Sequence, residues 1–167
     1  MKRALSILAV LGGFVGGLHG APAPTPIEVN GVDVAWRLDG PTLQFTISAP
    51  TSGWVALGLN SEDDIVGAEL FMMRFAENGP EASHRYVAAA GDHRPVEAFG
   101  RDPIISDLAG RRLGGSVEFT LTLRTDAASY QGPPLKSGAQ LWLIVAYSVS
   151  PDYDHHSRMR EHVRIRL

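Results

Sequence analysis

The hydrophobic pattern from position 32 to the end of the chain has a period of two. Alternating apolar and polar segments are separated by short runs rich in Gly, Pro, Asp and Ser, which is typical of antiparallel strands joined by turns. The clearest case is the pair 32–38 and 42–48 around Asp39-Gly40-Pro41, which predicts a β-hairpin. Further strands are predicted over 53–60, 68–76, 83–90, 105–113, 116–123, 140–149 and 161–167.

These segments predict an all-β domain, because none of them has the 3.6-residue period of a helix. About nine or ten strands at regular spacing favour a single β-sandwich. The segment 140–149 is apolar at nearly every position, which predicts a central strand covered on both faces. Within the other strands, the alternation places Trp54, Ala56 and Gly58 opposite Val55, Leu57 and Leu59, and Leu70, Met72 and Arg74 opposite Phe71, Met73 and Phe75.

The first residues have the features of a secretory signal peptide. Lys2 and Arg3 precede an apolar run that ends at Leu18, and small residues follow it. The run is too short and too rich in glycine for a membrane span of about 20 apolar residues. We therefore expect a signal peptide over 1–21, an N-terminal extension over 22–31 and the sandwich domain over 32–167. The protein is expected to be exported, periplasmic or secreted, without a membrane span after cleavage.

Composition excludes several functions. Removal of residues 1–21 changes the formal net charge from -3 to -5, because two basic residues and no acidic residue are lost. With no basic stripe in the sequence, nucleic-acid binding is not expected. The absence of cysteine excludes disulfides, iron–sulfur clusters and thiolate zinc sites. No Gly-x-Ser-x-Gly elbow, phosphate loop or HExxH helix is present, so an enzymatic role is not indicated.

The chain ends with three histidines close to the last predicted strand. His155, His156 and His162, with acidic residues nearby, offer ligands suited to Cu or Zn. The alternative is that they are solvated loop residues. Strand alternation from Val163 places His155 on the inward side and His156 and His162 on the outward side, provided that the preceding turn does not interrupt the count.

The order of motifs resembles the DOMON domain family from Val32 to Leu167. The resemblance is carried by Gly53-Trp54 and the strand after it, a polar loop over 61–65, Gly67-Ala68 and the last strands in their order. It implies an immunoglobulin-like antiparallel β-sandwich of about ten or eleven strands with a ligand pocket in or beside the sandwich. Members of this family serve as extracytoplasmic cytochrome domains with b-type haem, as sugar-binding modules or as non-catalytic domains of copper monooxygenases.

For the haem-binding members, the resemblance implies one Met and one His as axial ligands. His155 or His156 stands where the family's histidine enters, just before the final strand. The family's methionine falls near Ile65, and isoleucine cannot ligate iron. Met72 then becomes the methionine candidate, and the pocket candidates are Trp54, Ile65 and Met73.

The leading hypothesis is an exported DOMON-like ligand-binding domain, most specifically a module that binds haem b and transfers electrons. Its expected partner is a redox protein or a membrane cytochrome. The alternatives are a carbohydrate- or metal-binding module without redox chemistry, with a sugar or other small molecule as ligand, and an accessory domain of a redox system that has no cofactor of its own.

Overall fold

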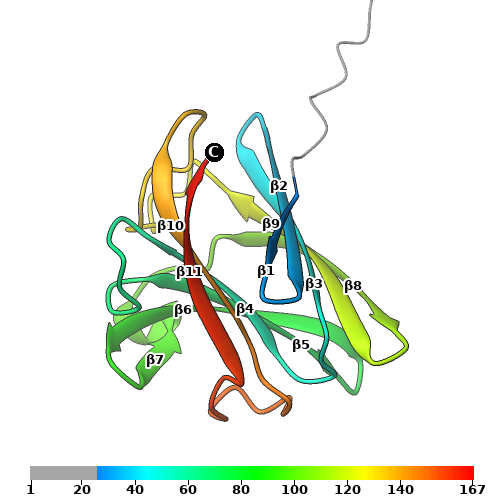
Figure 1. The fold of residues 1–167 in the computed structure, drawn as a ribbon. Helices are drawn as coiled ribbons and strands as arrows, with labels where there is room; N and C mark the ends of the chain where they lie inside the picture. Colours follow the sequence, from blue (N-terminus) through cyan, green and yellow to red (C-terminus); the bar gives the residue numbers. More distant parts are fainter. Residues whose placement is uncertain (1–25) are drawn as a thin grey trace, which may run out of the picture.

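The computed structural model describes residues 26–167, which fold into two antiparallel sheets packed face to face (Figure 1). Across the five-stranded sheet, the order is β1 (Ile27–Val29), β2 (Val32–Asp39), β3 (Thr42–Ala49), β9 (Ser116–Arg124) and β8 (Ile105–Leu113). Across the six-stranded sheet, it is β11 (Met159–Arg166), β10 (Gln140–Tyr147), β4 (Val55–Asn60), β5 (Glu69–Ala76), β6 (Gly79–Ala89) and β7 (Asp92–Pro95). A short 3₁₀ helix, η1 (Val96–Phe99), follows β7.

The predicted all-β sandwich is confirmed, with eleven strands instead of nine or ten. One additional strand is β1, which pairs with β2, so the sandwich begins before the domain boundary predicted at Val32. The predicted signal peptide lies outside the described residues. Within residues 26–167, no helix is long and apolar enough to cross a membrane.

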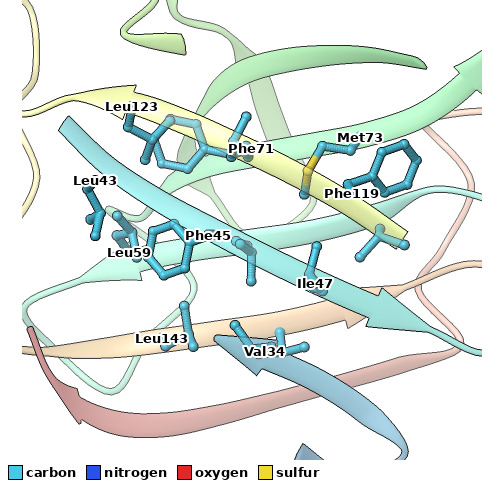
Figure 2. Close-up of a cluster of buried hydrophobic side chains, with 14 of the residues drawn as sticks. Val34, Leu43, Phe45, Ile47, Leu59, Phe71, Met73, Phe119, Leu123 and Leu143 are labelled. Atoms are coloured by element: carbon cyan, nitrogen blue, oxygen red, sulfur yellow. The ribbon is translucent and has the colours of Figure 1, made fainter. Parts of the chain in front are cut away.

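The core between the sheets follows from the period of two. In β3 and β9, every second side chain faces the other sheet and is buried, as Phe45 and Phe119 illustrate. Phe71 and Met73 of β5 enter the same space from the opposite sheet (Figure 2). Burial of such a side chain stabilises the fold by about 1.5–3 kcal/mol. In a domain without disulfides, this packing is the main source of stability.

Strand β4 differs from its neighbours because all six of its residues are buried. The inward positions Val55, Leu57 and Leu59 belong to the core between the sheets. On the outward side of β4, Ala56 belongs to a second apolar cluster on the other face of the six-stranded sheet. This second cluster contains Trp54, Ala56, Ala68, Leu70, Met72, Val87, Ile144, Ala146 and Tyr153, with Ile65 partly buried against it. The outer face of the central strands is therefore covered, and the covering segments are loops.

A network of charged residues is buried at the inner side of β5 and β6. The Glu69 carboxylate contacts His84 Nε2 at 2.8 Å and accepts two hydrogen bonds from the Arg101 guanidinium. Burial by itself would raise the pKa of Glu69, but the hydrogen bonds from His84 and Arg101 outweigh it and hold that pKa below the usual value. The His84 ring also stacks on Phe71 with 4.5 Å between ring centroids. The network therefore connects the segment after η1 to the edge of the core.

Candidate functional site

A cavity of about 240 Å³ lies on the outer face of the six-stranded sheet. Its floor is formed by β10, β4 and β5, which contribute the small Ala56 and Ala146 together with Ile144, Leu70 and Met72. Gly58 lies on the same face of β4, two residues after Ala56. A Cβ at Gly58 would lie 3.0 Å from Ile144 Cβ, so the small residue also allows Ile144 to pack closely. In register, Ala146, Ala56 and Met72 form one row across the floor, and Ile144, Gly58 and Leu70 form the next.

The loop between β4 and β5 forms one wall of the cavity and contributes Ile65. Asn60, the last residue of β4, donates from Nδ2 to the carbonyl oxygens of Asp64 at 2.7 Å and Val66 at 3.0 Å. Gly67 adopts a φ of 86°, which favours glycine, and its N–H donates to the Val87 carbonyl oxygen at 2.8 Å. These bonds fold a polar loop back over the sheet and place Ile65 against the cavity, while Val66 stays exposed.

The loop between β10 and β11 forms the opposite wall, and the Gly-Trp motif anchors it. Trp54 is buried and donates from Nε1 to the His155 carbonyl oxygen at 3.2 Å. At Gly53, a Cβ would lie 2.3 Å from the Ser148 carbonyl oxygen and 2.7 Å from the Ser150 nitrogen. Because these are backbone atoms, only glycine lets the two segments approach so closely. The Gly-Trp motif is therefore explained by this close backbone contact and by the Trp54 hydrogen bond, neither of which can be recognised from the sequence alone.

Tyr153 fastens the same loop over β5 and β6. Its hydroxyl lies within hydrogen-bonding distance of the carbonyl oxygens of Met72, at 3.2 Å, and Glu81, at 3.3 Å. The guanidinium carbons of Arg74 and Arg85 lie 4.4 and 5.0 Å from the ring centroid, which is cation–π distance. Burial, followed by the Glu81 charge, raises the pKa of Tyr153, so the phenol stays protonated and able to donate.

His155 lines the cavity, and its proton can be assigned from its partners. The ring Nδ1 lies 3.0 Å from the His156 carbonyl oxygen and 2.9 Å from the Ser148 hydroxyl oxygen. A carbonyl oxygen only accepts, so Nδ1 carries the proton in this contact. In the neutral ring, the lone pair is then on Nε2, the tautomer that a histidine ligand usually has when its other nitrogen donates to a carbonyl. His156 also lines the cavity, and its carbonyl helps to orient His155.

His93 of β7 lines a third side of the cavity, and Arg160 of β11 also contributes to its lining. The His93 Nδ1 lies 3.2 Å from Arg85 Nη1, and since a guanidinium only donates, this nitrogen accepts. Burial, then the positive charge of Arg85, lowers the pKa of His93, although Asp154 and Asp92 oppose the shift. Neutral His93 therefore carries its proton on Nε2, the reverse of His155.

The structure brings together five of the candidates derived from the sequence: Trp54, Ile65, Met72, His155 and His156 all line the cavity. The expectation for Met73 is corrected, because strand alternation turns its side chain into the core between the sheets. His162 lies outside the cavity lining, and its Nδ1 contacts Asp63 Oδ1 at 2.9 Å. No group of three metal-ligating side chains is found within residues 26–167, so the three terminal histidines do not form a joint metal site there.

Three residues near the cavity were missed by sequence reasoning. His93 lies between Gly91 and Pro95, outside the strands that the alternation predicts. Ser148, directly after β10, and Arg160, in β11, are polar residues like many others in the sequence. Only Ser148 could have been noticed in the sequence, because it is a small polar residue directly after the strongly apolar segment of β10.

No protein-family model matches the chain, and no curated protein matches it by sequence. Solved structures do resemble it. The cytochrome domain of cellobiose dehydrogenase from Myriococcum thermophilum has a TM-score of 0.59 at 10% identity, over 86% of this chain and 81% of that one. The cytochrome b domain of pyranose dehydrogenase from Coprinopsis cinerea also has a TM-score of 0.59 at 10% identity, over 81% and 76%. At this identity the likeness shows the fold alone: a β-sandwich shared with these two cytochrome domains.

Proposed function

We propose that the chain is an exported DOMON-like module that binds b-type haem in the cavity on the outer face of the six-stranded sheet and exchanges electrons with a redox partner. The observation that carries this proposal is His155, whose Nδ1 proton is engaged by backbone and Ser148 while Nε2 retains its lone pair. The fold shared with two cytochrome domains supports it.

The residues of the cavity fit a haem in three respects. His155 supplies an imidazole nitrogen, the floor and the Ile65 wall are apolar, and Arg160 supplies a positive charge for the carboxylates that haem carries. When bound, haem supplies a one-electron carrier whose potential depends on the axial ligand and on burial. The volume of about 240 Å³ is below the roughly 300–1,000 Å³ of sites for larger ligands, so we expect the two walls to separate on binding.

The expected partner is a redox protein, either a membrane cytochrome or a catalytic domain. The similar cytochrome domains belong to dehydrogenases, which favours a partner that oxidises a substrate. The polar lining of the cavity consists of histidines, Asp154, Ser157 and Arg160. The chemistry proposed for the chain is transfer of electrons.

Hemin titration of the full chain tests the proposal. We expect a Soret band that saturates at one hemin per chain. His155→Ala removes the proposed iron ligand itself. Loss of a residue that only hydrogen-bonds to such a ligand typically weakens binding by about 10–100-fold, so we expect His155→Ala to weaken hemin binding by more than that. His162→Ala is the matched control, because this histidine lies outside the cavity and should leave the titration unchanged. Absence of saturable uptake, or equal affinity of the His155→Ala protein, would refute the proposal.

A further inference from the structure

We propose that the cavity on the outer face of the six-stranded sheet also binds a small apolar molecule with one carboxylate, such as a medium-chain fatty acid, and that Arg160 receives the carboxylate. This is a second binding activity, and it does not depend on haem. The two ligands exclude each other, because they occupy the same space.

The size of the cavity favours a ligand much smaller than haem. Its volume is about 240 Å³, whereas the sites of larger ligands usually measure roughly 300–1,000 Å³. Haem enters only if the walls separate, but a single short hydrocarbon chain needs no such change. The cavity as it stands therefore fits a compact ligand.

The floor of the cavity supplies an apolar surface for the hydrocarbon part of this ligand. The lining residues of the floor are Ala56, Leu70, Met72, Ile144 and Ala146, all members of the second apolar cluster. Removal of hydrocarbon surface from water is favourable in proportion to the area that is buried. The floor therefore favours a ligand whose body is a hydrocarbon.

Arg160 lies at the β11 end of this floor and lines the cavity. In register it is paired with Ala146, which is paired in turn with Ala56. Both alanines carry only a methyl group, so they leave space beside the arginine. A guanidinium presents N–H donors in a planar fork that matches the two oxygens of a carboxylate. A carboxylate bound by Arg160 leaves its hydrocarbon part over the floor.

The carboxylates on and beside β11 are engaged with residues other than Arg160. Asp63 Oδ1 lies 2.9 Å from His162 Nδ1. Glu161 Oε2 accepts from Asn30 Nδ2 at 3.2 Å. Within residues 26–167, no carboxylate forms an ion pair with Arg160. Its guanidinium is therefore available to an anion from solution.

Asp154 is the one carboxylate in the lining of the cavity. It lies 3.8 Å from Nη1 of Arg85, whose positive charge offsets it. His93, which is paired with Val87 at the β7 end of the cavity, is neutral at pH 7, because burial and then the charge of Arg85 lower its pKa. Arg160 therefore carries the charge of this lining that has no counterpart, and a carboxylate is preferred to a neutral group.

Isothermal titration calorimetry of the haem-free full chain tests the inference, with octanoate and its neutral analogue octanamide as probes. We expect one octanoate per chain and at least about tenfold weaker binding of octanamide. Arg160→Gln should weaken octanoate binding by at least about tenfold and leave octanamide binding unchanged, because only the ion pair is lost. Arg164→Gln is the matched control: Arg164 lies on the same face of β11 but outside the lining, so octanoate affinity should equal that of wild type.

A second variant tests the location of the site. Ala56→Leu fills part of the space above the floor, so it should weaken octanoate and octanamide alike, and a thermal melt shows whether the fold is intact. Octanoate should also compete with hemin in a chain that binds both. Unchanged octanoate binding in folded Ala56→Leu, or simultaneous binding of octanoate and hemin, would place the fatty acid elsewhere and overturn the inference.

The other outcomes separate this inference from the proposed function. A chain that binds octanoate in the predicted way but takes up no hemin supports the inference and contradicts the proposed function. A chain that takes up hemin but binds no octanoate does the reverse. Equal affinity for octanoate and octanamide, or equal octanoate affinity of Arg160→Gln and wild type, shows that Arg160 does not receive the carboxylate, and the inference is then wrong.

Discussion

At the scale of single residues, the orientation of His155, the proposed iron ligand, depends on Ser148, which does not itself line the cavity. Ser148 is buried, and its hydroxyl lies 2.9 Å from His155 Nδ1 and 3.0 Å from the His156 carbonyl oxygen. It also accepts from the Ser150 N–H at 3.2 Å. The hydroxyl therefore joins both histidines to the backbone at the end of β10, and it acts as a positioning group for the His155 ring.

Ser148→Ala should weaken hemin binding by about 10–100-fold, the usual cost of removing an outer-shell partner of a metal-binding histidine. The loss arises because Nδ1 retains only the His156 carbonyl and the ring is free to turn. Hemin titration measures it, and a thermal melt shows whether the fold is intact. Ser150→Ala is the matched control, because the Ser150 side chain accepts only from the Asp152 N–H at 3.1 Å and should leave affinity unchanged. Equal affinity of the Ser148→Ala and wild-type proteins would contradict the positioning role.

The sequence identifies the histidines but cannot choose between them. Counting alternation back from Val163 fails, because β11 begins only at Met159 and the residues before it form a loop. The distinction between His155 and His156 depends on Ser148, which meets them only after the loop has folded back. A parity rule holds along one strand and gives no information about a loop.

At the scale of elements, the histidine loop is held by close backbone contact at Gly53. Gly53→Ala would place a methyl group 2.3 Å from the Ser148 carbonyl oxygen, so the loop must move. We expect destabilisation of about 1–3 kcal/mol, as for an overpacked site, together with weaker hemin binding. Urea unfolding measures the first effect and hemin titration the second. Ser52→Ala, at the exposed neighbouring position, should change stability by no more than about 0.5 kcal/mol. A Gly53→Ala protein as stable as wild type would show that the segments do not touch.

The strands themselves were largely predictable, since alternation in 42–48 and 116–123 matches the observed burial. The two faces predicted for 53–60 are also confirmed. What the pattern could not show is that the outer face of β4 is covered. The covering loops, 61–67 and 148–158, are polar in sequence, and their apolar contacts come from one residue each, Ile65 and Tyr153.

At the scale of the whole molecule, the buried Glu69 network is a second feature that sequence reasoning missed. Glu69, His84 and Arg101 come from three segments, and each is ordinary in its own context. Strand alternation could have indicated it, because it places Glu69 on the inward face of β5 with Phe71 and Met73. A buried carboxylate on that face requires a hydrogen-bonding or charged partner. Only the folded arrangement of β5, β6 and the segment after η1 supplies that partner.

This network predicts how the domain responds to acid. The folded pKa of Glu69 lies below its ordinary value of 4.5, so its ionised form contributes stability that is complete above about pH 4.5 and is lost as pH falls through the folded pKa. Glu69→Gln should destabilise the protein by about 3–5 kcal/mol at pH 7, because Arg101 loses its buried partner. When the pH is lowered from 5, the variant should also lose less stability than wild type, because it has no carboxylate at position 69 to protonate. Denaturant unfolding at a series of pH values measures both effects, with exposed Glu97→Gln as the control. Parallel acid profiles for Glu69→Gln and wild type would show that another group governs acid unfolding.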